Sequence, residues 1–492
     1  MKETFLIMIP VLIPILTGLF LLVNPALKKR SVLLGIVSAG LIVTAVSVFA
    51  VILGEGDSFT LFYLTKTLPV YFKIDGMGRL FVTVVTVVWL AAGFFSFVYM
   101  KHEENEKRYF GFYLITYGVL IALDFSGNIV TFYMFYELMT LLSMPLVLHN
   151  GSREAIMAGL KYLFYSFCGA YMVLFGLYFV YRFSNTLTFT AGGVLNQELI
   201  SGREPFLLFV VFLMILGFGV KAGMFPLHGW LPTAHPVAPA PASAVLSGII
   251  VKGGVLGIIR TVYYLFGADF IRGTWVQTVW LSLTLFTVFM GSMLAYREKV
   301  LKKRLAYSTV SQLSYILFGL ALLNPIGLEG ALLHVTVHAF VKSALFLCAG
   351  AIIYKTGTTQ VDGLSGIGKQ MPVTIWCYTI VSLALVGIPP TGGFLSKWYL
   401  SLGALDTEIP FFSWFGPAVL LLSALLTAGY LLPITVKGFF PGKDFDYDHL
   451  EKKEPSKFMV IPVLVLAVLA TVIGMFPAPV LFFLTDMIGK LV

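Results

Sequence analysis

The stretch KAGMFPLHGWLPTAHPVAPAPASAVLSGIIVKGGVLGIIR, residues 221–260, decides how the rest of the chain is interpreted. Lys252 lies inside it, with about ten apolar or small residues before it and seven after it up to Arg260, together about the length of a membrane span. A charge at the centre of a bilayer costs at least about 2.5 to 3.5 kcal/mol on insertion scales. The stretch therefore indicates a membrane-spanning helix whose charged side chain faces protein rather than lipid.

The composition of the whole chain is that of an integral membrane protein. Of its 492 residues, 58% are hydrophobic and 12% are charged, which is about half the charged share of a soluble fold. The net charge of +9 comes from Lys and Arg residues spread between apolar runs, so that we expect no nucleic acid partner. Three distant cysteines have no metal-binding or redox spacing. The lipid bilayer is therefore the expected partner of the protein's largely apolar surface.

Fourteen apolar runs are long enough to cross a membrane, which predicts an all-α, polytopic fold in a single integral membrane domain over residues 1–492. The spans are expected near residues 4–24, 32–53, 77–100, 110–125, 128–148, 158–181, 206–230, 241–266, 275–295, 305–323, 329–354, 375–400, 412–437 and 458–485. The first run lacks a small-residue cleavage site, so we interpret it as a retained span.

Lys and Arg residues favour one set of loops. The loops after the odd-numbered spans carry about 19 of them, and the other side with both termini carries about 7. The excess marks the cytoplasmic side. We therefore expect a protein of the cytoplasmic membrane with both termini facing outward.

Seven of the titratable side chains inside the expected spans are candidates for function. They are Glu137, Lys221, Lys252, His334, His338, Lys342 and Lys397. His334, His338 and Lys342 recur every four residues, which places them on one side of a helix over a rise of about 12 Å. Desolvation makes a buried lysine neutral in one state and charged in another. The seven side chains are therefore predicted to form a proton relay.

Simpler interpretations of some of these side chains stay open. A long lysine near a span end, such as Lys221 or Lys397, can reach the membrane interface and do nothing else. Glu137 alone in lipid would be protonated, whereas a pair with Lys221 would keep it ionised. His334 and His338 have the i, i+4 spacing of metal ligands, but no third ligand is evident. We expect a Glu137–Lys221 pair, no metal and no cofactor.

Helix-breaking residues lie beside the lysines. Pro226 follows Lys221, Gly253 and Gly254 follow Lys252, and prolines and glycines at 389–393 precede Lys397. Broken backbone at membrane depth is tolerated only beside protein or a hydrated cavity.

The broken spans, the seventh and the twelfth, are five spans apart, which fits two inverted five-helix repeats formed by spans 4 to 8 and 9 to 13. The expected division is residues 1–105 (spans 1 to 3), 106–270 (first repeat), 271–440 (second repeat) and 441–492 (a cytoplasmic loop and the last span).

The order of proton transfer follows from these positions. Lys221 is expected to release its proton to Lys252 when it separates from Glu137, and His338 and Lys342 are expected to connect the two halves. Lys397 would then release the proton outward. Water linking these groups is expected along one polar face of the tenth span, at Ser308, Thr309, Ser311, Gln312 and Ser314. One clear carboxylate among four lysines argues against sodium on this path, because hard cations prefer several oxygen ligands.

Three segments resemble one known family. They are the 221–260 stretch, HVTVHAFVKSALFLCAG at 334–350 and GIPPTGGFLSKWYL at 387–400, together with Glu137 in FYELM. They are similar to the antiporter-like subunits of respiratory complex I, Mrp antiporters and membrane-bound hydrogenases. The resemblance implies two inverted repeats, a hydrophilic axis in the membrane plane, and proton translocation by Glu137, Lys221, Lys252, His338, Lys342 and Lys397. Lys397, where one complex I subunit would have Glu, favours the D-type Mrp subunit or its hydrogenase counterpart.

The resemblance implies a proton-translocating subunit of a multi-subunit ion-pumping complex, either an Mrp-type cation/proton antiporter or a ferredoxin- or NADH-driven oxidoreductase. Other integral membrane subunits are the expected partners, with peripheral iron–sulfur, hydrogenase or dehydrogenase subunits in a redox-driven complex. The chain itself shows no redox chemistry, which leaves its status as part of an enzyme open. Two alternatives are a self-contained secondary transporter of a small solute, whose site would show mixed polar groups, and a membrane scaffold, which needs no mid-bilayer charge.

Overall fold

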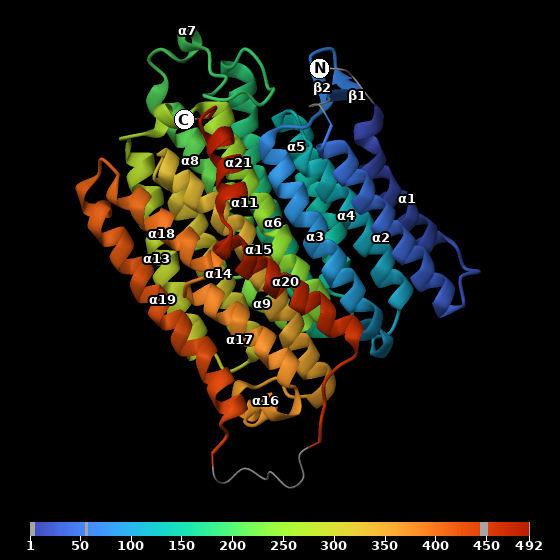
Figure 1. The fold of residues 1–492 in the computed structure, drawn as a ribbon. Coiled ribbons are helices and arrows are strands. Elements are labelled where there is room, and N and C mark those ends of the chain that lie inside the picture. Colours follow the sequence, from blue (N-terminus) through green and yellow to red (C-terminus); the bar gives the residue numbers. More distant parts are fainter. Residues whose placement is uncertain (1–4, 55–57, 443–450, 492) are drawn as a thin grey trace.

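The computed structural model describes residues 5–54, 58–442 and 451–491. These residues form a long bundle of helices with one short hairpin at one end (Figure 1). The expectation of an all-α, polytopic membrane fold is confirmed. Residues 1–4, 55–57, 443–450 and 492, which include both termini and part of the expected last cytoplasmic loop, lie outside the described residues.

The helices follow one another along the chain with few long connections. The first half contains α1 Ile9–Val23, α2 Arg30–Ile52, α3 Gly76–Tyr99, α4 Glu106–Asp124, α5 Ile129–Val147, α6 Arg153–Phe183, α7 Gln197–Ile200, α8 Glu204–Lys221, α9 Leu231–Val237, α10 Ala240–Val245, α11 Lys252–Ile259 and α12 Ala268–Ile271. The second half contains α13 Trp275–Arg297, α14 Leu301–Ala321, α15 Pro325–Thr356, α16 Ile367–Gln370, α17 Pro372–Val386, α18 Gly392–Leu405, α19 Pro410–Phe439, α20 Lys457–Met475 and α21 Ala478–Ile488.

Short 3-10 turns lie at Phe5–Met8, Met100–His102 and Val361–Leu364. The strands are β1 Ser58–Thr65 and β2 Leu68–Lys73.

Eleven helical segments of the described chain are long and apolar enough to cross a membrane. Of the three other expected spans, those at α4 and α14 are helices of 19 and 21 residues that fall outside this group, and the third is divided into α17 and α18. The polar side chains that the sequence analysis assigned to one face of α14, together with Lys302, Lys303 and Arg304 at its start, account for its lower hydropathy. The count of fourteen spans stays a prediction.

Two segments form the interior of the bundle. The 32-residue helix α15 is buried along nearly its whole length and packs against α3, α10, α14, α17, α18 and α20. The segment from Ala240 to Phe266 is buried at every position of its apolar window. These two segments carry Lys252, His334, His338 and Lys342, so the chain places its charged residues on the helices furthest from lipid.

The two broken spans are present where the sequence predicted them. The helix α8 ends at Lys221 and the chain is not helical again until α9 begins at Leu231. The helix α17 ends at Val386, and Gly387 at φ +93° starts the connection to α18. A positive φ is a conformation that glycine adopts without strain.

The break expected at Gly253 and Gly254 is not there, because α11 runs through both glycines. The two glycines instead allow α11 to pack closely against its neighbours. A Cβ on Gly254 would lie 2.5 Å from the carbonyl oxygen of Phe218 in α8. The irregular backbone lies just before Lys252, as a π-helical turn at Leu246–Ile250, and again at Arg260–Phe266. π-Helical turns of this kind occur often at functional sites.

The last predicted span is also divided, into α20 and α21 at residues 476–477.

A β-hairpin, which the sequence analysis did not predict, covers one end of the bundle. Strands β1 and β2 are antiparallel, and β2 joins the connection between α4 and α5. The Lys73 amide donates to the Phe125 carbonyl over 2.8 Å, and the Asn128 side-chain amide donates to the Pro69 carbonyl over 2.8 Å. The strands SFTLFYLT and LPVYFK are rich in aromatic and β-branched residues, which was the available signal.

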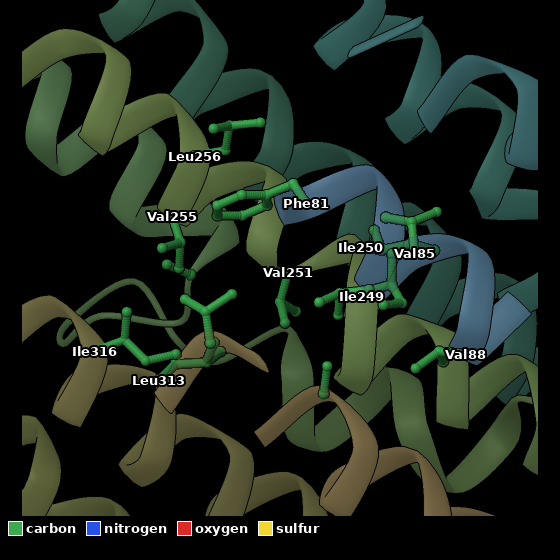
Figure 2. Close-up of a cluster of buried hydrophobic side chains, with 14 of the residues drawn as sticks. Phe81, Val85, Val88, Ile249, Ile250, Val251, Val255, Leu256, Leu313 and Ile316 are labelled. Atoms are coloured by element: carbon green, nitrogen blue, oxygen red, sulfur yellow. The ribbon is translucent and has the colours of Figure 1, made fainter. Parts of the chain in front are cut away.

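Apolar side chains fill the space around the centre of the bundle. Figure 2 shows Phe81, Val85 and Val88 of α3 facing Ile249, Ile250, Val251, Val255 and Leu256, with Leu313 and Ile316 of α14 below them. All of these residues are buried. The cluster surrounds the backbone on both sides of Lys252 and separates its helix from lipid.

The close contact between α20 and the broken span gives a test of the fold. A Cβ on Gly474 would lie 2.2 Å from the Pro390 carbonyl oxygen and 2.3 Å from the Gly392 amide nitrogen, both backbone atoms. We expect Gly474→Ala to lower the stability of the detergent-solubilised protein by about 1 to 3 kcal/mol, because the backbone must shift. Thermal unfolding measures the change.

The matched control is Gly35→Ala, since Gly35 lies in α2 and a Cβ added there would have no neighbouring atom within 4 Å. This variant should be neutral or stabilise by up to about 1 kcal/mol, because alanine favours a helix. Equal melting temperatures for the two variants would contradict the packing described for α20.

Candidate functional site

Four of the seven predicted relay residues lie along one line through the interior. Lys252 Nζ lies 3.0 Å from His338 Nδ1, and the His338 and His334 rings stack at 5.8 Å. His334 Nδ1 lies 2.8 Å from the hydroxyl of Ser396, the neighbour of Lys397 in α18. The line therefore connects the first half of the chain, through α15, to the second half.

Lys397 reaches this line beside Tyr315, whose ring is 5.7 Å from the His334 ring and 4.9 Å from Lys397 Nζ. The ammonium group donates to the carbonyl oxygens of Leu385 (2.6 Å) and Val386 (3.0 Å). These are the last carbonyls of α17, which have no partner within their own helix. Lys397 therefore caps the end of the broken helix. Its side chain does not extend to the membrane interface, as the simpler interpretation had it.

Lys221 lies in a cage of hydroxyl groups at the other broken helix. Its Nζ donates to Thr140 Oγ1 (2.8 Å), the Tyr162 hydroxyl (3.0 Å) and Ser166 Oγ (3.0 Å), and the side chain is fully buried. The Tyr162 ring also faces the ammonium group at 4.4 Å. Full burial excludes a lysine that reaches the interface.

The expected direct pair between Glu137 and Lys221 is not formed. A lysine ammonium has three donors, and the three hydroxyls take all of them. Glu137 is half-buried, and its Oε1 is buried without a hydrogen-bond partner among the described residues. Thr140 follows Glu137 by three residues on α5, a rise of about 4.5 Å. Glu137 therefore lies about one helical turn from the hydroxyl cage of Lys221.

Lys342 lies on a side branch of the line. Its Nζ donates to Ser308 Oγ (2.6 Å) and to the Leu305 carbonyl (3.2 Å) of α14, and Ser308 contacts the Tyr430 hydroxyl at 2.7 Å. The structure places Lys342 against α14, beside the line that His338 and His334 form, and its expected role in linking the two halves stays a prediction.

The polar face of α14 is buried as expected, but most of it is occupied by protein partners. Besides Ser308, Thr309 contacts Ser247 at 2.7 Å and Ser311 contacts Ser292 at 2.9 Å. The amide of Gln312 and the hydroxyl of Ser314 are buried with no partner in the described chain. These last two side chains are the ones with free hydrogen-bonding capacity for water.

Sequence reasoning missed several buried polar residues. His235 is fully buried with neither ring nitrogen partnered among the described residues, and Lys302 donates to the nearby Pro236 and Ala238 carbonyls. Asp124 and Arg260 are 2% and 1% exposed. The signal for the last two was present, because both fall inside the expected spans 110–125 and 241–266.

The two lysines at the broken helices have different kinds of partner, and this difference has a chemical consequence. Hydroxyl groups donate and accept, whereas carbonyl oxygens only accept. The cage of Lys221 can turn its hydroxyls to serve either an ammonium or a neutral amine, but the carbonyls at Lys397 favour the ammonium. In the part of the chain that the structure describes, no group of three or more His, Cys, Asp or Glu side chains is placed to hold a metal ion.

Comparison with known proteins gives the class to which this architecture belongs. Residues 126–427 match the family described as NADH:quinone oxidoreductase/Mrp antiporter, transmembrane region, and residues 64–110 match the N-terminus of chain 5 of NADH-ubiquinone oxidoreductase (complex I). The first match covers more than half of the chain and includes all seven predicted relay residues. The chain belongs to the NADH:quinone oxidoreductase/Mrp antiporter family.

Relatives in two kinds of complex are similar over most of their length. The N subunit of the NADH-quinone oxidoreductase of Desulforudis audaxviator is 31% identical, covering 82% of this chain and 81% of its own. The D-type subunit of the Na(+)/H(+) antiporter of Alkalihalophilus pseudofirmus is 27% identical, covering 96% and 94%. A chain of the Mrp complex from Dietzia sp. has the same fold, with a TM-score of 0.83 over 99% of this chain and 98% of that one at 22% identity.

The line of contacts gives a test at its centre. We expect His338→Gln to slow the proton transfer that runs along this line by about 100-fold, since glutamine cannot take up and release the proton that a positioned histidine transfers. The rate is measured with a pH-sensitive dye in membrane vesicles. His102→Gln, at an exposed position outside the line, is the control. A normal rate in His338→Gln vesicles with the protein present at its usual level would exclude His338 from the path.

Proposed function

We propose that this chain is the proton-translocating, antiporter-like membrane subunit of a multi-subunit ion-pumping complex. The observation that carries the proposal is the buried line from Lys252 through His338 and His334 to Lys397. Every group on this line can bind and release a proton or pass one along a hydrogen bond. Family membership supports the same assignment.

The proton moves along the line by exchange between neighbouring groups. Lys252 gives its proton to His338 Nδ1, which converts the amine to its neutral form and the imidazole to imidazolium. His338 releases a proton from Nε2, and His334 takes one up at its own Nε2; both atoms are buried and without protein partners among the described residues. His334 then passes a proton from Nδ1 toward Ser396 and Lys397.

Lys221 supplies the proton to Lys252. The two lysines lie on helices in close contact, since a Cβ on Gly254 would be 3.0 Å from Lys221 Cβ. Ionised Glu137 stabilises the charged form of Lys221, and loss of that influence favours release of the proton. Glu137 lies beside Leu138 and Leu141, which are 38% and 43% exposed, so a neighbouring membrane subunit can contact this face of α5.

Lys342 sets the electrostatic field on the branch at Ser308. Its positive charge lies one helical turn from His338 on α15, and it disfavours a second positive charge on that ring. Water at Gln312 and Ser314 of α14 would complete the hydrogen-bonded path. With these roles for Lys342 and the water, each of the seven predicted relay residues takes part in the proposed mechanism.

The broken spans support a division into two inverted repeats. We assign residues 106–270 to the first repeat and 271–440 to the second, with spans 1 to 3 before them and the last span after residue 441. Lys221 precedes the break in the first repeat, whereas Lys397 follows the break in the second repeat. The two repeats therefore differ in detail.

We propose the cytoplasmic membrane as its location, with the α16 end of the bundle facing the cytoplasm and the hairpin end facing outward. The Lys and Arg excess in the loops at the α16 end supports this orientation. Partners are other integral membrane subunits. Peripheral redox subunits join them if the complex resembles that of the oxidoreductase relative, and a cation antiport activity applies if it resembles that of the antiporter relative.

Replacement of Lys221 tests the function. We expect Lys221→Ala to abolish proton transport in vesicles, because the relay loses the group that loads Lys252, while the complex still assembles on a native gel. Lys369→Ala changes an exposed lysine of α16 and should leave transport unchanged. Normal proton transport in Lys221→Ala would overturn the proposal, and a selective change in uptake of a small solute would favour the self-contained transporter.

Accessible cysteines test the orientation. In a chain with Cys168, Cys348 and Cys377 replaced by serine, we expect Lys66→Cys in the hairpin to react with an impermeant maleimide on intact cells. Lys299→Cys, at a position that is 75% exposed near Asp362, should react only after the membrane is opened. The reverse pattern would mean that the hairpin faces the cytoplasm.

A further inference from the structure

A second buried titratable cluster lies in the first half of the chain, away from the line to Lys397. Arg260 donates to both carboxylate oxygens of Asp75, which precedes α3 and caps it. The guanidinium also lies against the rings of Phe189 and Tyr264 at 4.7 and 4.6 Å. Asp124, the last residue of α4, lies within electrostatic range of the same guanidinium.

The side chain of Asp124 forms no hydrogen bond or ion pair, among the described residues, that would explain its burial as structural. It is 2% exposed, and its Oδ2 is buried without a hydrogen-bond partner among the described residues. A carboxylate at the C-terminal end of a helix also faces the negative end of the helix dipole. An ionised, unpaired carboxylate in such a place is strongly disfavoured. Since Asp75 already neutralises Arg260, the cluster of two carboxylates and one guanidinium is electrically neutral only with one proton bound.

Asp124 shares a small cavity with Lys252. Its lining is Asp124 and Lys252 with apolar side chains of α3, α4 and the π-helical turn, among them Phe81, Leu123 and Ile249. The space open to the centre of a water molecule is about 10 Å³, which is about what one water requires. Phe81 and Ile249 belong to the apolar cluster in Figure 2. A narrow apolar passage of this kind conducts only when it is hydrated.

We propose that Asp124 is a proton-binding residue that receives a proton from Lys252 and delivers it to the hairpin end of the bundle, in parallel with the route through Lys397. Asp124 first releases its own proton toward the hairpin end, which breaks its O–H bond. It is then reprotonated: an N–H bond of the Lys252 ammonium breaks and an O–H bond forms again on the Asp124 carboxylate, through one water. Asp75, whose side chain is 22% exposed, connects the cluster to the surface. This inference rests on the proposed function, because Lys252 must be loaded by the relay.

The test uses the intact complex in membrane vesicles and separates parallel from serial paths. If two routes leave Lys252, Lys397→Ala and Asp124→Asn each lose part of the proton transport rate, and the double variant loses all of it. Asp124→Glu should restore part of the rate. Asp269→Asn, at an exposed aspartate of α12, is the matched control and should transport normally.

Infrared difference spectroscopy of the same complexes reports protonation directly. A carbonyl band of a protonated carboxylic acid is expected in the wild type, absent in Asp124→Asn and shifted in Asp124→Glu. It should also disappear in Asp75→Asn, because Asp124 then becomes the counterion of Arg260. A merely structural aspartate would not produce this pattern.

Two kinds of outcome would overturn the inference, and only the second would also overturn the proposed function. If Lys397→Ala alone abolishes transport, or if adding Asp124→Asn to it changes nothing and the band is unaffected, the parallel route is wrong and the relay stands. If Lys221→Ala transports normally in the same vesicles, the proposed function fails and this inference fails with it.

Discussion

A buried lysine must find its hydrogen-bond acceptors inside the protein, since lipid offers none, and this constraint shapes the whole bundle. Lys221 is held by three hydroxyls from α5 and α6, Lys252 by a backbone carbonyl and a histidine, Lys342 by α14, and Lys397 by the end of α17. Each set of acceptors fixes the position of one helix against another. The broken spans and π-helical turns exist where a straight helix would not bring these groups together.

The apolar part of the structure serves the same constraint. The cluster shown in Figure 2 surrounds the helix that carries Lys252, and the glycines of α11 let it approach α8 closely. Exclusion of water from this region strengthens every charge–charge interaction within it. A change of charge at Glu137 is therefore screened less at Lys221 than it would be in a hydrated protein.

The sequence predicted the features that depend on local pattern and missed those that depend on contacts between distant helices. Apolar length gave the membrane fold, and charged residues in apolar runs gave the seven relay candidates. The Glu137–Lys221 pair was inferred from charge alone, and nothing local shows that Thr140, Tyr162 and Ser166 converge on one ammonium. His334 and Lys342 lie on the same face of one helix, and only the neighbouring helices show that their side chains have different partners. Asp124 was available to the same reasoning as Glu137 and was overlooked at the edge of its span.

The uninterrupted course of α15 has a mechanical consequence. His334, His338 and Lys342 are fixed to one uninterrupted helix, with about 6 Å of rise between successive groups, so the helix sets their mutual spacing. Their partners are carried differently: Lys252 follows a π-helical turn, and Lys397 follows a broken connection. In the proposed relay, movement would therefore be confined to the two ends, where a proton would be loaded and unloaded. The middle would act as a stationary bridge, so that one end could disconnect before the other engages, and this order of events would prevent protons from leaking straight across the membrane.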